Sequence, residues 1–274
     1  MTEATANNSE SSLLLWLVAM AVMLLAAHVY LAWIRHARRE PELRRSWPAL
    51  LAAAATLGTG ICSSMVLALS AEALAFPLGY QWWRVLLLWG GAMLGCVPVA
   101  WWLWRQPGLL STLVGGALVA ALAVGVQMGW VMAAGFRPGI VWRTEFVALA
   151  AVLAVAGAMV ALWVAFSSGA NEGQRRGLWR LGGAALLGVS LLVGQEGLFF
   201  SISLAAQVGS IFHREVPAFV LCLLGGVLFP LLMSAMAFDL AMRRRSRRRS
   251  HKDAGNGFAP HPRRRRRRYK HRQL

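Results

Sequence analysis

Long apolar stretches alternate with short polar ones along the whole chain. Each apolar stretch is near the roughly 20 residues that an α-helix needs to cross a hydrocarbon core of about 30 Å. The stretches cover residues 13–34, 48–70, 85–104, 109–134, 146–166, 181–205 and 216–240. The pattern predicts an all-α, polytopic membrane protein whose seven transmembrane helices occupy residues 13–242.

The composition agrees with this class. Hydrophobic residues make up 58% of the chain and charged residues only 14%, which leaves little material for a water-soluble domain. Residues 1–12 are polar and lack the basic start of a secretion signal, so we expect a retained first helix preceded by a short extracytoplasmic tail.

Basic residues predict the orientation. All but four of the 28 Lys and Arg residues fall on one side of the predicted helices. The four exceptions are Arg84, Arg137, Arg143 and Arg214. Because loops rich in Lys and Arg stay in the cytoplasm, we expect the N-terminus outside and the C-terminus inside a bacterial inner (plasma) membrane.

The chain contains an internal repeat. Helices two and four carry small residues at the same four-residue step, and each is followed by a Phe-Pro turn that ends in Trp-Arg. Helices six and seven form a third, looser copy, so the predicted architecture is one leading helix plus three repeated helical hairpins. Small residues allow close helix packing in lipid. The expected packing positions are Gly60, Ser64, Gly125 and Gly129.

Three stretches of the even-numbered helices carry a resemblance to a known family. LGTGICSSMVLAL, LAVGVQMGWVMAA and LLGVSLLVGQEGLFF resemble the Gly-x-x-Met-His-Tyr-x-Gly-Met motif of bacterial MHYT sensor proteins. The resemblance covers residues 13–242 and implies seven helices with the N-terminus outside. It also implies a copper site that senses oxygen, carbon monoxide or nitric oxide and passes the signal to a cytoplasmic domain.

The motif histidines are missing. An alignment without gaps puts Met65, Trp130 and Gln195 at their positions, and a shift of one residue in helix four puts Gly129 there instead of Trp130. Without imidazole, only soft thioether and thiol ligands remain for a Cu(I)-like ion, and Met65, Met128, Met132 and Cys62 are the candidates. We therefore expect no cofactor, with copper as the minor alternative.

Polar side chains gather at the same depth. Gln127, Gln195 and Glu196 fall in the outer third of their helices, where an ionisable group usually marks a functional place. We expect Glu196 to be uncharged and hydrogen-bonded, beside Gln195 and with Gln127 opposite. The predicted ligand site or former metal site comprises Met65, Gln127, Met128, Trp130, Met132, Gln195 and Glu196.

A basic tail follows the last helix. Residues 243–274 contain 15 of the 28 Lys and Arg residues, a composition typical of disorder. Anionic lipid headgroups are the expected partner, because each cation near such a surface contributes on the order of 1 kcal/mol. The contacting residues would be Arg243, Arg244, Arg245, Arg247, Arg248 and Arg249. Nucleic acid is a less favoured partner, since no folded reader accompanies the tail.

No catalytic motif is present in the sequence, so we do not expect an enzyme. The favoured hypothesis is a sensory or partner-binding membrane module that is derived from an MHYT-type sensor. Because no output domain follows Met242, we expect a separate membrane or cytoplasmic protein partner. The alternatives are a small-molecule or proton transporter, or an accessory subunit of a respiratory or carbon monoxide oxidation system.

Overall fold

The computed structural model describes most of the membrane region. The described residues are 2–40, 42–72, 79–106, 108–137, 140–167, 175–204, 209–210, 212 and 215–242. The chain divides into two units, Met1–Met236 and Ala237–Leu274. Within the second unit, residues 237–242 are helical, and the predicted lipid contacts at Arg243–Arg249 lie outside the described residues.

Among the described residues, seven helices are long and apolar enough to cross a membrane, which confirms the predicted class. Six are α1 (Thr2–Ala37), α2 (Leu43–Ala71), α3 (Trp82–Arg105), α4 (Leu109–Ala133), α5 (Thr144–Ser167) and α6 (Arg175–Phe200). The seventh span, Ala218–Met242, begins as α7 (Ala218–Leu223) and passes through one π-helical turn, η1 (Leu224–Leu228). It then continues as an α-helix over residues 229–242.

Two helix ends differ from the prediction. The predicted span 181–205 is wrong at its end, because α6 stops at Phe200 and residues 202–204 form a strand. Ser201 follows the helix directly, and its hydroxyl donates to Leu198 O at 2.6 Å. At the other end of the chain, α1 begins at Thr2, so helix continues through the segment that was expected to be a tail. Hydropathy shows how apolar a segment is. It does not show where the backbone hydrogen bonds of a helix give way to those of a strand.

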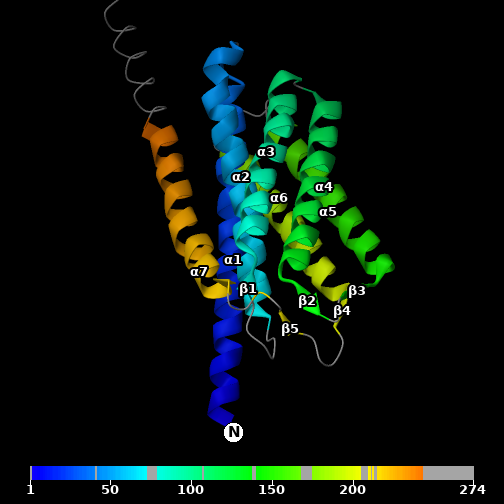
Figure 1. Cartoon of the computed structure of the whole chain (residues 1–274). Helices are drawn as coiled ribbons and strands as arrows, with labels where there is room; N and C mark the ends of the chain where they lie inside the picture. The colour runs from blue at the N-terminus through cyan, green and yellow to red at the C-terminus, as the bar shows by residue number, and fades with distance from the viewer. Residues whose placement is uncertain are drawn as a thin grey trace, which may run out of the picture. The chain divides into compact units, whose positions relative to one another are not determined.

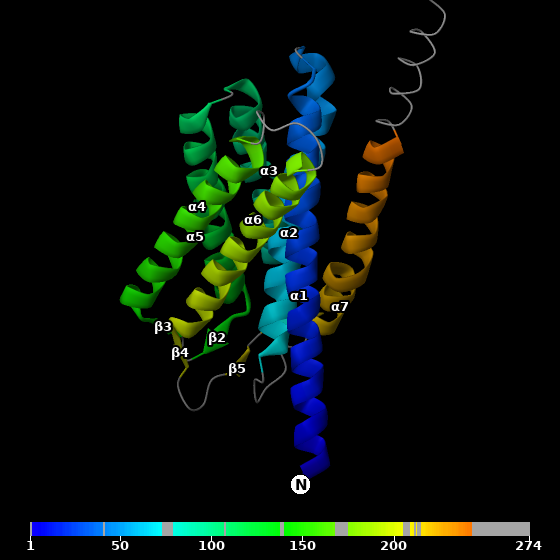
Figure 2. The ribbon, with the colours of Figure 1, turned by 180° about the vertical axis from the view of Figure 1, so that it is seen from behind.

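The helices of the first unit pack in chain order. Each helix from α1 to α6 contacts the next one, and α6 contacts α1, so the six helices close a ring. The even-numbered helices also approach one another, because α4 contacts both α2 and α6, and Ser64 of α2 is hydrogen-bonded to Gln195 of α6. α7 packs outside this ring against α2, on the side away from α4 and α5 (Figures 1 and 2).

The expected packing residues lie in different surroundings. A Cβ on Gly60 would come within 2.2 Å of Ala26 Cβ, and one on Gly129 within 2.5 Å of Leu88 Cδ2. Ser64 is fully buried. Gly125 differs from the expectation: an added Cβ would meet nothing within 4 Å, because this face of α4 is exposed.

Short strands follow the even-numbered helices, where the sequence predicted plain turns. In the described part of these loops they form three antiparallel pairs: β1 (Gly79–Tyr80) with β6 (Val216–Pro217), β2 (Phe136–Arg137) with β5 (Gly209–Ser210), and β3 (Ile140–Trp142) with β4 (Ile202–Leu204). They lie at the same end of the helices as the start of α1 (Figure 1). We call this the strand end.

One serine connects the segments after the three even-numbered helices. Ser210 of β5 is buried, and its hydroxyl lies 2.7 Å from Ala134 O and 3.2 Å from Gly79 O. Ala134 closes α4, where Gly135 adopts a positive φ of 62°, the left-handed conformation in which glycine commonly ends a helix. The loop after α6 is thereby tied to the end of α4 and to the loop after α2.

Candidate functional site

The three positions that align with the motif histidines are all buried, each near the strand end of its helix. Met65, Trp130 and Gln195 each have 0% exposure. Gln195 is held by α2: its Nε2 donates to Ser64 O at 3.5 Å, and the Ser64 hydroxyl lies 3.3 Å from Gln195 Oε1. A side chain so placed connects α2 with α6 inside the bundle.

Two aromatic side chains pack against Trp130. Its ring centroid lies 5.3 Å from that of Tyr80 and 5.7 Å from that of Trp89, both in edge-to-face geometry, which is a favoured arrangement for aromatic pairs. Burial raises the pKa of the Tyr80 phenol above its usual range, and the nearby Cys222 thiol adds to the effect. Tyr80 is therefore neutral at physiological pH, and this cluster of rings carries no charge.

The other predicted site residues on α4 differ in how deeply they are buried. Gln127 has 0% exposure, and neither polar atom of its side chain has a hydrogen-bond partner among the described residues. Met128, on the next position, is half-buried. Met132 lies on the outward face of α4 and is 57% exposed. It therefore does not belong to a buried site.

Gln195 and Glu196 do not share one environment, contrary to the expectation. Successive residues of an α-helix point about 100° apart, so Gln195 faces α2 while Glu196 faces α1. The partner of Glu196 is Trp16, whose Nε1 donates to Glu196 Oε1 at 2.9 Å. The hydrogen bond joins α1 to α6 at the strand end, where an amide partner was predicted.

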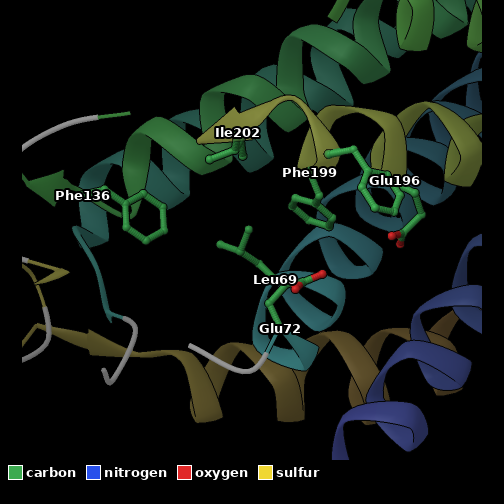
Figure 3. Close-up of a pocket in the computed structure, with 7 residues that line it drawn as sticks. Leu69, Glu72, Phe136, Glu196, Phe199 and Ile202 are labelled. Atoms are coloured by element: carbon green, nitrogen blue, oxygen red, sulfur yellow. The ribbon is translucent and has the colours of Figure 1, made fainter. Parts of the chain in front are cut away.

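Glu196 also lines a pocket of about 230 Å³. The pocket is bounded by Leu69, Glu72, Phe136, Glu196, Phe199, Phe200 and Ile202. These residues come from the end of α2, from β2 after α4, and from α6 with the following strand β4. In Figure 3 the carboxylates of Glu72 and Glu196 lie toward one side of the pocket, while Phe136 and Ile202 lie toward the other.

Of the seven residues that line this pocket, only Glu196 was predicted from the sequence, and its hydrogen-bond partner Trp16 was not predicted either. Glu72, Phe136 and Trp16 were not assigned to the site, because they lie far from Glu196 in the chain. A signal existed for Glu72, which is an acidic residue at the end of helix two, at the same depth as Glu196. Phe136 carried a weaker one, since it belongs to the repeated Phe-Pro turn.

Metal-binding groups are sparse in the described part of the chain. There, no three His, Cys, Asp or Glu side chains come close enough together to hold a metal ion. The free cysteines Cys62 and Cys96 are buried, and Cys222 is half-buried.

At the opposite end of the helices, one basic residue is engaged in packing. Arg38 Nε donates to Leu103 O at 2.8 Å, and the guanidinium lies 3.9 Å from the centroid of the Phe166 ring. Burial lowers the pKa of Arg38 to about 10, which leaves it charged at neutral pH. Arg38 thus connects α1 with α3 and α5.

The fold and the site together define a multi-pass helical membrane protein with a small, partly acidic pocket at its strand end. No model of a known protein family matches the chain, and no curated protein or solved structure shows significant similarity to it.

Proposed function

We propose that the chain is a sensory or partner-binding module of the bacterial inner membrane, derived from an MHYT-type sensor, and that the strand-end pocket is its ligand site. The strand end faces the outside in this proposal, because the positive-inside bias puts 24 of the 28 Lys and Arg residues on the cytoplasmic side. The module is not an enzyme.

The spacing of the three buried positions supports three repeated hairpins. Met65, Trp130 and Gln195 follow one another at intervals of 65 residues, and each is fully buried. Equal spacing together with equal burial is expected if helices two, four and six descend from one unit. Methionine, indole and amide groups now occupy the positions that hold imidazoles in the family, so no copper site is proposed.

The composition of the pocket is the observation on which the proposal mainly rests. Its residues come from the ends of α2 and α6 and from the strand after α4, and Ser210 ties the same segments together. A ligand in this pocket contacts all three copies of the repeat at once. A sensor requires that ligand binding change its conformation. A ligand does so only if it binds one conformation more tightly than another. A ligand that contacts all three copies does so when their relative positions differ between the two conformations.

Transport is the second candidate. Intramembrane ionisable residues mark transport routes as well as sensors, and Glu196 is such a residue. A proton or solute carrier would require Glu196 to exchange its proton or ligand between the two sides of the membrane.

A variant that fills the pocket tests whether the pocket is the ligand site of the sensory module. Ile202 on β4 lines the pocket (Figure 3), so Ile202→Trp fills part of it with a larger ring. Val141 on the paired strand β3 is 69% exposed, and Val141→Trp is the matched control. We expect Ile202→Trp to alter the transcript profile of the native cell as strongly as deletion of the chain does, and Val141→Trp to leave it unchanged.

Reconstitution in liposomes separates the two candidates. If the chain is a sensory module, liposomes that contain it should show no proton or solute flux above that of empty liposomes under an imposed pH gradient. A flux that depends on the parent chain and disappears in Glu196→Gln would refute the sensory proposal and establish transport.

A further inference from the structure

We propose that the strand-end pocket binds an organic monocation: an ammonium group attached to a small apolar body. This inference rests on the pocket being the ligand site of the proposed function, and it names the chemical class of the ligand.

The charge of the ligand follows from the two acids, which are both ionised in this proposal. Glu196 then differs from the uncharged side chain that the sequence predicted, because the Trp16 indole donates to its Oε1 and a hydrogen bond to the charged form favours that form. Glu72 and Glu196 contribute the only ionisable side chains among the seven described residues that line the pocket. Within the described part of the chain, the Glu72 carboxylate has no hydrogen-bond or ion-pair partner, and Glu196 accepts one hydrogen bond, at Oε1 from Trp16. Oε2 of Glu196 therefore remains available. The two carboxylates lie toward the same side of the pocket (Figure 3), so an ammonium group there meets two negative charges, and charge-assisted hydrogen bonds to carboxylates are the strong ones.

The apolar body of the ligand follows from the remaining lining. Phe136 and Ile202 lie on the side of the pocket away from the carboxylates, while Phe199 lies beside Glu196 and Leu69 beside Glu72 (Figure 3). Aromatic faces also attract cations, by about 0.5–2 kcal/mol according to exposure. A metal ion would leave this apolar side without a partner, and an anion would meet two carboxylates.

The size of the ligand follows from the volume. A cavity of about 150 Å³ accommodates benzene, so the pocket of about 230 Å³ accommodates one ring with a short aminoalkyl chain. Two sources could supply such an ammonium group at the surface of a membrane: a free amine, or the headgroup of phosphatidylethanolamine.

Calorimetric titration of the purified full chain in a neutral maltoside detergent at pH 7 tests the inference. The probes are phenethylammonium and 2-phenylethanol, which has nearly the same shape but no charge. We expect saturable binding of phenethylammonium, at least about tenfold tighter than that of the alcohol. Glu72→Gln and Glu196→Gln should each weaken phenethylammonium binding by about tenfold or more.

The control is Glu145→Gln. Glu145 is an exposed acid in the first turn of α5 that does not line the pocket, so its replacement should leave the affinity unchanged. Equal affinity for the amine and the alcohol, or equal affinity of the parent and both pocket variants, would overturn the inference, as would the absence of any saturable binding.

Ile202→Trp separates this inference from the proposed function. If both probes bind the parent equally and Ile202→Trp abolishes both, the pocket is a ligand site but the ligand class is wrong. If Ile202→Trp leaves phenethylammonium binding intact, the strand-end pocket is not the binding site, and both proposals fail. Competition by short-chain phosphatidylethanolamine, and not by phosphatidylglycerol with the same chains, would identify a lipid headgroup as the natural source; the lack of competition would identify a free amine.

Discussion

Glu196 on α6 accepts a hydrogen bond from the Trp16 indole on α1, at 2.9 Å, and so connects two helices at the strand end. Glu196→Gln keeps an oxygen that can accept this bond, and it should unfold at the same temperature as the parent. Glu196→Leu loses the bond, which is partly accessible to solvent because Trp16 is 38% exposed. We expect a loss of about 0.5–1.5 kcal/mol in the free energy of unfolding.

Thermal unfolding of both variants in detergent measures this difference. If Glu196→Leu is as stable as Glu196→Gln, the hydrogen bond to Trp16 contributes nothing, and the carboxylate of Glu196 serves only the pocket.

Met65, Trp130 and Gln195 stand where the resemblance places metal-binding histidines. All three are fully buried, and Gln195 is hydrogen-bonded to Ser64. We therefore predict that the purified chain holds much less than one copper per molecule, as measured by elemental analysis after dialysis against copper. One copper per chain that is lost in Met65→Ala would show instead that thioethers have replaced the imidazoles.

At the level of helices and strands, Ser210 holds the strand end together. Its hydroxyl lies 2.7 Å from Ala134 O, and both residues are buried. Ser210→Ala leaves that carbonyl without its closest donor, so we expect a loss of about 1–2 kcal/mol in the free energy of unfolding. The matched control is Ser167→Ala on α5, an exposed serine whose replacement should change stability by no more than about 0.5 kcal/mol. Equal unfolding temperatures of the two variants would contradict the role of Ser210.

The same elements show how far the sequence predicts this fold. Hydropathy locates all seven helices, because crossing a membrane demands long apolar runs. It extends the sixth helix too far, since residues 202–204 are apolar enough for a span but pair with β3 instead. The strand pairs escape prediction because each joins two or three residues that are distant in the chain.

The site was predictable only in part. Glu196 stands out as an ionisable residue in an apolar helix, and Gln195 and Trp130 follow from the resemblance. Their partners do not follow, because Trp16 lies 180 residues before Glu196. The helical rotation between Gln195 and Glu196 also separates two neighbours that the sequence placed in one pocket.

On the scale of the whole molecule, the proposed topology puts the acidic pocket on the outer face of the membrane, because 24 of the 28 Lys and Arg residues are expected on the cytoplasmic side. One labelling experiment in intact cells tests location, access and charge together. Ile202→Cys is exposed to two membrane-impermeant methanethiosulfonate reagents, one bearing a trimethylammonium group and the other a sulfonate. Val141→Cys, on the exposed side of the same strand pair, is the control, and the parent chain measures any reaction at its three native cysteines.

After correction for the intrinsic reactivity of each reagent, we predict that the cationic reagent modifies Ile202→Cys about tenfold faster than the anionic one, because a cleft lined by one sign of charge concentrates the opposite ion. The preference should fall when Glu72→Gln or Glu196→Gln is added, and Val141→Cys should show no preference for the cation. Modification of Val141→Cys but not of Ile202→Cys from outside, or equal rates for both reagents at Ile202→Cys, would contradict the account.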